Sequence, residues 1–171
     1  EKPGVMLRSV KQTIDGAVYF FYESGAMATG WVLMSEGWYY TFGSGAMVTG
    51  WILLGRTWYY LDGGNEEYPG LMLADCGKEI GGAKYFFGRN GAMPTGWVLR
   101  PEGWYYTSRS GAMVTGWSYI GGAWYYLDGS NEEYPGLMLA DCGKEIGGAK
   151  YFFGRNGAMP TGWVLRPEGW Y

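Results

Sequence analysis

Histidine is absent from this 171-residue chain, and charged residues are sparse. Without histidine the sequence lacks the commonest general base, a frequent metal ligand and the central residue of serine and cysteine catalytic triads. The net charge of −3, from 13 basic and 16 acidic residues spread thinly, excludes the basic surface that binds nucleic acid. We therefore expect no metal, no cofactor and no enzymatic activity, since catalysis would depend on carboxylates alone.

Long apolar runs are also missing. None approaches the about 20 residues of a membrane span, and the initial EKPGVMLRSV is unlike a signal peptide. We expect a piece of a longer chain that does not span a membrane. What the sequence has in excess is glycine, with 32 residues, and aromatic side chains, with 10 Trp, 16 Tyr and 7 Phe. This mixture favours turns and strands over helices.

The aromatic residues follow a repeat. Residues 65–105 recur unchanged as residues 131–171, an offset of 66, and the first part of the chain keeps the same offset. Aromatic triplets such as Trp38-Tyr39-Tyr40 divide each block more finely, at spacings of 20, 20 and 26 residues. The predicted organisation is one module over residues 1–171, with super-repeats 1–66, 67–132 and a partial 133–171.

Each short unit predicts a β-hairpin, because two runs of aromatic and branched residues flank a glycine-containing turn. A single hairpin is marginally stable in water, so a series of them must stack and bury rings between neighbours. The grouping in threes predicts an all-β solenoid with about three hairpins per turn, one turn for each 66-residue block. Trp51 and Trp58 flank a turn near Leu54-Gly55-Arg56, and we expect their indoles to lie opposite each other.

Some hairpins lack the tryptophan pair. Lys84 replaces the second tryptophan where Gly77 replaces the first, and Lys11 and Val18 stand at these places in the first hairpin. The two tryptophans are lost together, in hairpins that keep the rest of the repeat. This pattern is typical of residues that act together in one functional site. Paired indoles with a third ring from the next hairpin would form a cage for a quaternary ammonium, each ring contributing about 0.5–2 kcal/mol. The alternative is a structural spacer whose rings only fill a core.

The stretch TGWVLMSEGWYYTFGSGAMVTGW, residues 29–51, resembles the choline-binding repeat of bacterial wall hydrolases and surface proteins. This resemblance implies a left-handed solenoid that docks choline on teichoic acids, hence a secreted protein of the bacterial cell surface or cell wall. It also implies cages built from two tryptophans of one hairpin and a tyrosine of the next, often closed by a methionine such as Met47 or Met113.

Carried onto this chain, the implied choline-binding residues form four complete cages and the start of a fifth. They are Trp31, Trp38 and Tyr59; Trp51, Trp58 and Tyr85; Trp97, Trp104 and Tyr125; Trp117, Trp124 and Tyr151; and Trp163 with Trp170. The adjacent ring of each triplet is on the opposite face and is an alternative third wall: Tyr60, Phe86, Tyr126 or Phe152.

Two further alternatives concern the partner. Hairpins of the IGGAKYFF kind, with the insertion DGGNEEYPGLMLADCG, resemble repeats of glucan-binding domains and clostridial toxins. Because flat rings also stack on sugars, a glucan or other oligosaccharide stands beside choline as the predicted ligand. Pairing of two modules into a homodimer is a further open alternative.

Overall fold

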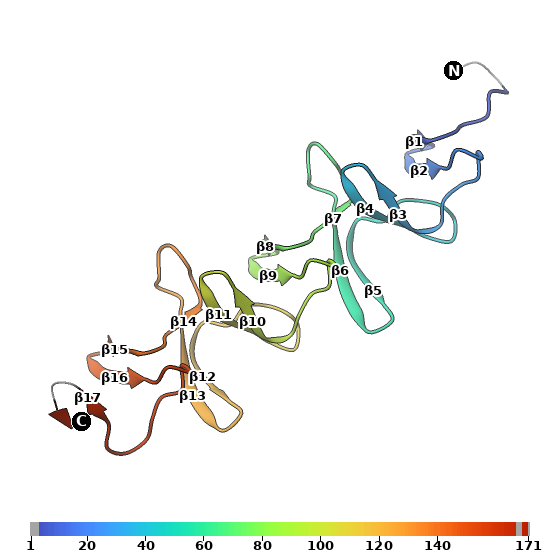
Figure 1. The fold of residues 1–171 in the computed structure, drawn as a ribbon. Coiled ribbons are helices and arrows are strands. Elements are labelled where there is room, and N and C mark those ends of the chain that lie inside the picture. The colour runs from blue at the N-terminus through green and yellow to red at the C-terminus, as the bar shows by residue number, and fades with distance from the viewer. Residues whose placement is uncertain (1–3, 167–168, 171) are drawn as a thin grey trace. The chain divides into compact units, whose positions relative to one another are not determined.

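The computed structural model describes residues 4–166 and 169–170, and every regular element in that part of the chain is a β-strand (Figure 1). The strands are β1 (Val10–Ile14), β2 (Ala17–Phe21), β3 (Gly30–Met34), β4 (Gly37–Thr41), β5 (Gly50–Leu54), β6 (Thr57–Asp62), β7 (Leu71–Met72), β8 (Cys76–Ile80), β9 (Ala83–Phe87), β10 (Gly96–Arg100), β11 (Gly103–Thr107), β12 (Gly116–Ile120), β13 (Ala123–Asp128), β14 (Leu137–Met138), β15 (Cys142–Ile146), β16 (Ala149–Phe153), β17 (Leu165–Arg166) and β18 (Gly169–Trp170). They form two-stranded hairpins, of which β5–β6 and β12–β13 gain a short third strand.

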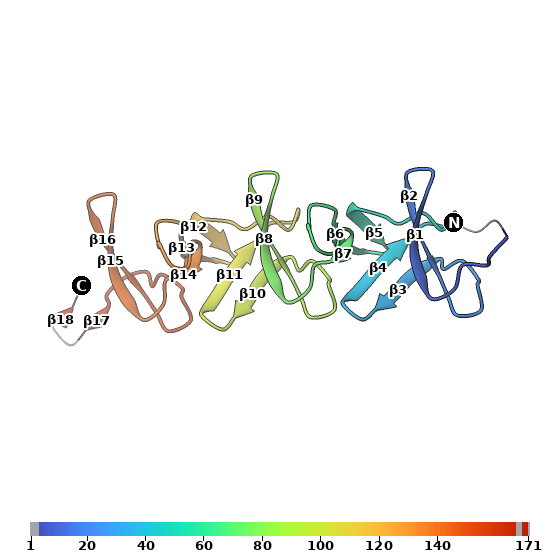
Figure 2. The same ribbon diagram turned by 90° about the horizontal axis from the view of Figure 1, so that it is seen from above.

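The chain divides into two compact units. The first comprises the described residues up to Cys76 together with Phe87–Met93, and the second comprises Gly77–Phe86 and the described residues from Pro94 onward. The second unit shows the predicted three hairpins per turn. In Figure 2, β8–β9 and β15–β16, which are three hairpins apart, point the same way, while β10–β11 and β12–β13 between them point elsewhere. The predicted all-β stack of antiparallel hairpins is confirmed. Its left-handedness stays a prediction.

Two-residue turns close the hairpins from β1–β2 to β15–β16 and fix their register. In the first, Asp15 and Gly16 both have positive φ, 48° and 81°, as in the tight turns that match the right-handed twist of the flanking strands. In β5–β6 the turn is Gly55-Arg56, and Leu54 therefore pairs with Thr57.

This register corrects the expected indole pairing. Trp51 lies directly opposite Tyr60, and Trp58 lies opposite Leu53. The two tryptophans share a face but are diagonal neighbours, because so short a turn pairs residues nine apart at this level of the ladder rather than seven apart.

Backbone hydrogen bonds join consecutive hairpins within each unit. The amide of Met47, after the second hairpin, donates to the carbonyl of Val18 in the first at 2.8 Å. The same link recurs from Met93 to Trp58, from Met113 to Lys84 and from Met159 to Trp124, at 2.8–2.9 Å. Each link is made at the first residue of an aromatic triplet, so the stacking of the backbone fixes where the triplet side chains stand.

The core consists of small clusters between hairpins. Phe20, Ala28, Val32 and Tyr39 form one in the first unit, while Phe86, Val98 and Tyr105 form its counterpart in the second. Thr41 is buried beside the first cluster, where its hydroxyl donates to the carbonyl of Ala28 at 3.1 Å. In the described part of the chain, no helix is long and apolar enough to cross a bilayer.

Candidate functional site

Strand alternation assigns the rings of each triplet to different faces. In β4, Trp38 and Tyr40 lie on one face, and Tyr39 with Thr41 lies on the other, where both are buried. The tryptophans of a hairpin therefore face the following hairpin, and the first tyrosine of the triplet faces the preceding one. Within a unit, the predicted combination of two tryptophans with the next hairpin's first tyrosine is what this alternation brings together.

The first cage contains Trp31, Trp38 and Tyr59. The ring centroids of Trp31 and Trp38 are 6.2 Å apart with an interplanar angle of 84°, and those of Trp31 and Tyr59 are 5.0 Å apart at 73°. Tyr40 supports Trp31 from the same hairpin at 5.1 Å. Trp31 is thus held edge-on by two tyrosines, and a cavity of about 320 Å³ lies against the three predicted rings.

Two more cages in the second unit repeat this arrangement. Trp97 and Trp104 are 6.3 Å apart at 86°, with Tyr125 at 4.9 Å from Trp97. The remaining trio is Trp117, Trp124 and Tyr151: the two indoles are 6.4 Å apart at 85°, and the tyrosine is 4.7 Å from Trp117. Cavities of about 330 and 360 Å³ lie against these two trios.

Other predicted site residues are brought together in part. Trp51 and Trp58 show the same indole geometry, 6.3 Å and 88°, with Tyr60 5.0 Å from Trp51. Tyr85, the tyrosine predicted for that pair, belongs to the second unit, so this cage stays a prediction. In the last pair, Trp163 is largely exposed, while the side chain of Trp170 lies outside the described residues.

The methionines suggested as closing groups are elsewhere. Met47 packs on the Phe20 core cluster, and Met113 packs on its counterpart in the second unit. The cavities are lined instead by Met72, Met138 and Met159. A signal for Met72 is present in the sequence, since Gly70-Leu71-Met72 in the longer insertion repeats the pattern of Gly-Ala-Met.

Sequence reasoning also missed an arginine and an asparagine at two of the cavities. Arg89 and Asn90 line the Trp31 cavity, and Arg155 and Asn156 line the Trp97 cavity. They occupy the centre of β-turns in which Gly91 donates to Gly88 and Gly157 to Gly154, both at 2.9 Å. Each of these turns follows the second hairpin after the one that carries the tryptophans. A sequence pattern within one hairpin therefore does not predict that the two regions meet.

Exposure distinguishes the second tryptophan of each pair. Trp38 is 42% exposed, and its counterparts Trp58, Trp104 and Trp124 are similarly open. An indole left this accessible in every complete repeat forgoes much of the stabilisation that its burial would provide. A ligand placed in the cage would cover these faces, so the arrangement suits a binding site better than a filled core.

Lysine-bearing hairpins differ chemically from the cages. The ammonium of Lys11 lies 4.6 Å from the centroid of Tyr39 and donates to the carbonyl of Pro69 at 3.3 Å. Burial lowers the pKa of Lys11, and the nearby Glu36 carboxylate partly opposes that effect. In the second unit Lys84 lies 5.8 Å from Tyr105. At these interfaces the chain's own cation covers the tyrosine face.

The tyrosines at the lysine interfaces also use their hydroxyls structurally. Tyr39 donates to Glu36 and Tyr105 to Glu102, at 2.8 and 2.9 Å. Burial, followed by the carboxylate partner, raises the pKa of both phenols. Hydrogen bonds from Ser35 and Tyr39 in turn lower the pKa of Glu36. At the lysine interfaces, then, the tyrosine ring is buried and its hydroxyl is already bonded within the chain.

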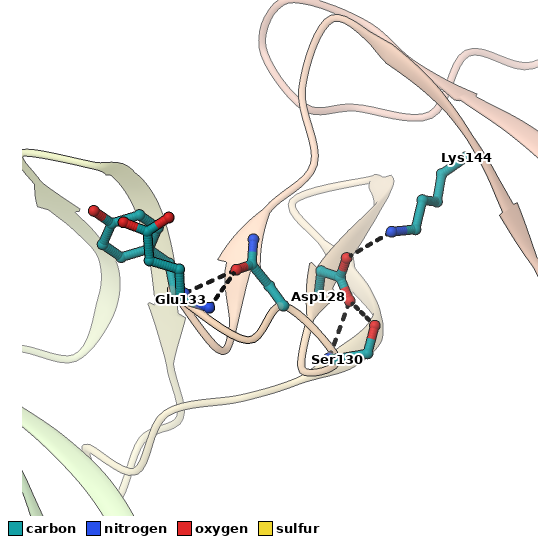
Figure 3. Close-up of polar contacts among 6 residues, drawn as sticks. Asp128, Ser130, Glu133 and Lys144 are labelled. Atoms are coloured by element: carbon teal, nitrogen blue, oxygen red, sulfur yellow. Dashed lines mark hydrogen bonds and ion pairs between the residues drawn. The ribbon is translucent and has the colours of Figure 1, made fainter.

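A buried carboxylate braces the hairpins around the Trp117 cage. Asp128, at the end of β13, accepts hydrogen bonds from the Ser130 hydroxyl at 2.6 Å and from Lys144 of β15 at 3.2 Å (Figure 3). Burial favours its neutral form, but the bonds from Ser130 and Lys144 outweigh this and lower the pKa of Asp128. The contact ties the hairpin of Trp117 to the one that carries Tyr151.

Two related family models match the chain. One, described as a choline-binding repeat, matches residues 8–50 and 78–113. The other, described as a putative cell wall binding repeat, matches residues 49–64, 115–130 and 144–159. The chain matches no protein in the curated set.

Several solved structures are similar. Choline-binding protein F from Streptococcus pneumoniae, solved with a peptidoglycan analogue, has 30% identity and a TM-score of 0.77, over 94% of this chain and 56% of that one. CbpJ from Streptococcus pneumoniae TIGR4 has 35% identity and a TM-score of 0.74, over 90% and 48%. The pneumococcal cell wall endolysin from phage Cp-1, solved with choline, has 34% identity and a TM-score of 0.53, over 79% and 38%. The chain thus spans about half the length of the first two.

Proposed function

Since the chain belongs to the choline-binding repeat family, we propose that it is a non-catalytic attachment module that holds choline groups on teichoic acids of a bacterial cell wall. Each site is a cage of two tryptophans and the first tyrosine of the next hairpin. The proposed residues are Trp31, Trp38 and Tyr59; Trp97, Trp104 and Tyr125; Trp117, Trp124 and Tyr151; and, by the same pattern, Trp51, Trp58 and Tyr85.

The observation that carries this proposal is the perpendicular indole pair beside an open cavity. Trp31 and Trp38 present two faces at 84° to the same space, and Tyr59 supplies a third ring. A quaternary ammonium has no hydrogen to donate, so its recognition depends on ring faces that attract its charge and contact its methyl groups. The endolysin from phage Cp-1, similar in structure, was solved with choline.

Repetition would make weak sites effective. A single cage binds in roughly the millimolar range when its rings contribute as estimated above. Several cages on one chain, meeting a polymer that carries many choline groups, gain about 10²- to 10⁴-fold through avidity. Since this chain corresponds to only part of its structural relatives, the activity of any attached domain is separate, and we assign the module itself to anchoring at the cell surface.

Calorimetry with choline tests the proposal. The wild-type chain should release heat on titration with choline, and Trp104→Ala should remove one site, because it deletes an exposed wall of the Trp97 cage. The control is Leu99→Ala, which shortens an exposed side chain beside Trp104 and leaves all three rings of the cage in place. It should leave the number of sites unchanged.

Dextran is the competing ligand in the same experiment. Heat with dextran and none with choline would replace the choline proposal with glucan binding. If neither ligand produces heat or raises the melting temperature, the chain is a structural spacer.

A further inference from the structure

The ammonium group of Lys11 occupies a small aromatic site in the first unit. The ring centroids of Phe20 and Tyr39 are 5.1 Å apart at 44°, and Nζ of Lys11 lies 5.6 Å from the first and 4.6 Å from the second. Nζ also donates to the carbonyl of Pro69 at 3.3 Å. Two ring faces with a carbonyl acceptor suit a primary ammonium, because it has both a charge for the rings and a hydrogen for the oxygen.

Lys84 places a second ammonium in the equivalent site of the second unit. The rings of Phe86 and Tyr105 are 5.0 Å apart at 48°, and Nζ of Lys84 lies 5.5 Å and 5.8 Å from their centroids. A Cβ at Gly77 would come within 3.3 Å of Cε of Lys84. The missing side chain at Gly77 therefore leaves room for the stem of the lysine.

The two lysines reach these sites from different strands. Lys11 lies in β1, at the place of the first tryptophan of a cage hairpin, whereas Lys84 lies in β9, at the place of the second. Val18 and Gly77 stand at the other place in each hairpin. The two hairpins thus differ in which position carries the lysine, but both put an ammonium over the same pair of rings. The shared feature is the charge over the rings and not the stem that carries it.

A carboxylate lies at the far end of each tyrosine and favours a positive occupant. The hydroxyl of Tyr39 donates to Glu36, and that of Tyr105 donates to Glu102. The charge of Glu36 attracts the Lys11 ammonium and opposes the fall in the pKa of Lys11 that burial causes. A neutral molecule in the same place would gain nothing from this charge.

We propose that the two lysine interfaces are binding sites for a primary ammonium, which the chain fills with its own side chains: Lys11 and Lys84 are tethered ligands. The tether keeps the ammonium at a high effective concentration, so each site stays occupied without any free ligand. A chain that lacks the lysine stem should then bind a free primary alkylammonium in its place. This inference concerns sites apart from the tryptophan cages and does not depend on what those cages bind.

Chemical rescue of Lys11→Ala tests the proposal. The substitution removes three carbons and the nitrogen, which together correspond to n-propylammonium. We expect the melting temperature to fall by about 2–4 °C, because one cation–π contact is lost. Added n-propylammonium chloride should restore it in a concentration-dependent way. Nuclear Overhauser effects should connect the methylene protons of the bound amine to ring protons of Tyr39.

Two other probes define the ligand class. n-Propanol has a similar shape but no charge, and it should restore nothing. Tetramethylammonium has the charge but no hydrogen to donate to the carbonyl of Pro69, and it should restore less than n-propylammonium does. Each response is measured against the wild type at equal ionic strength, because the tryptophan cages are intact in both proteins.

Lys11→Met is the matched control variant. Its neutral stem fills the place of the lysine stem, so it should lose stability like Lys11→Ala but should not respond to n-propylammonium. Lys84→Ala tests the second copy through the ring protons of Tyr105. We expect a smaller recovery there, since the guanidinium of Arg100 lies 5.8 Å from Phe86 and remains as a second cation.

Three outcomes would overturn the inference. The first is a response of Lys11→Ala to n-propylammonium no larger than that of the wild type. The second is equal recovery with n-propanol or with tetramethylammonium, which would show that the site does not select a primary ammonium. The third is recovery without a nuclear Overhauser effect to Tyr39, which would place the amine elsewhere. If Lys11→Ala does not fold, the same three outcomes are read from Lys84→Ala and Tyr105.

Discussion

At the scale of single residues, two first tyrosines of successive triplets have different roles. Tyr39 is fully buried at a lysine interface and donates its hydroxyl to Glu36 at 2.8 Å. Tyr59 faces Trp31 in a cage, where the ring itself is the useful surface. The same sequence position thus contributes to the core in one hairpin and to a candidate ligand site in the next.

Removing the two hydroxyls should reveal this difference. Tyr39→Phe loses a charge-assisted hydrogen bond and leaves Glu36 without that donor, so we expect it to lower the free energy of unfolding by about 1–3 kcal/mol. Tyr59→Phe keeps the cage wall and should change stability by less than about 0.5 kcal/mol. Urea unfolding of both variants checks this, and equal losses would contradict the distinction.

The lowered pKa of Asp128 predicts that the stability of the fold depends on pH. Because hydrogen bonds lower its pKa in the folded state, it adds stability above the unfolded pKa of about 3.9, and that stability is lost as pH falls through the folded value. Lys144→Met should cost about 1–3 kcal/mol at neutral pH by leaving a buried carboxylate short of a donor. The difference from wild type should shrink as acid protonates Asp128.

The control for this titration is the exposed ion pair of Arg155 with Asp141, at 3.9 Å. Arg155→Met should alter stability by at most about 0.5 kcal/mol at any pH, since such pairs are screened by solvent. Thermal melts of both variants across acid pH provide the measurement. A constant deficit for Lys144→Met down to the lowest pH would show that the charge of Asp128 is irrelevant.

At the scale of elements, much of the site follows from the hairpin itself. Period-two alternation is enough to place Tyr59 and Tyr60 on opposite faces of the hairpin, but it left open which of them meets the preceding hairpin. The exact register could not be predicted from the sequence pattern. With the turn at Gly55-Arg56, the two indoles are diagonal neighbours and not opposite each other. A sequence indicates a turn more reliably than it indicates which residues close it.

The turn glycines connect hairpin geometry to the cage. Gly16 and Gly91 have similar φ values, +81° and +77°, but a Cβ at Gly16 would meet nothing within 4 Å, whereas one at Gly91 would collide with Met72. Gly16→Ala should therefore cost only the left-handed backbone strain of about 1–2 kcal/mol. Gly91→Ala should cost more, and it should also weaken choline binding at the Trp31 cage by moving Met72.

Melting temperatures and indole titrations of the two alanine variants test this pairing. Equal losses of stability with unchanged binding at Trp31 would contradict a role for the Gly91–Met72 contact in shaping the cage. Binding at the Trp97 cage should be the same in both variants, because its own turn glycine, Gly157, and its own Met138 are intact.

At the scale of the whole molecule, repetition was the most informative feature of the sequence. The 66-residue period predicted the stacking of hairpins, and the alternation of tryptophan and lysine hairpins predicted where cages stand. Met72 and Arg89 escaped prediction because they reach the Trp31 cavity from later hairpins. Such contacts depend on how the chain stacks in three dimensions, which the composition of any single repeat does not determine.

The most direct test of the central claim is to observe which protons of the protein approach the methyl groups of bound choline. Intermolecular nuclear Overhauser effects should connect the trimethylammonium protons to ring protons of the three described cages, at Trp31, Trp97 and Trp117 and at their partner rings. The lysine interface of Tyr39 should give none, since Lys11 already covers that ring. Contacts confined to exposed side chains such as Leu33, with none to the cage rings, would contradict the account.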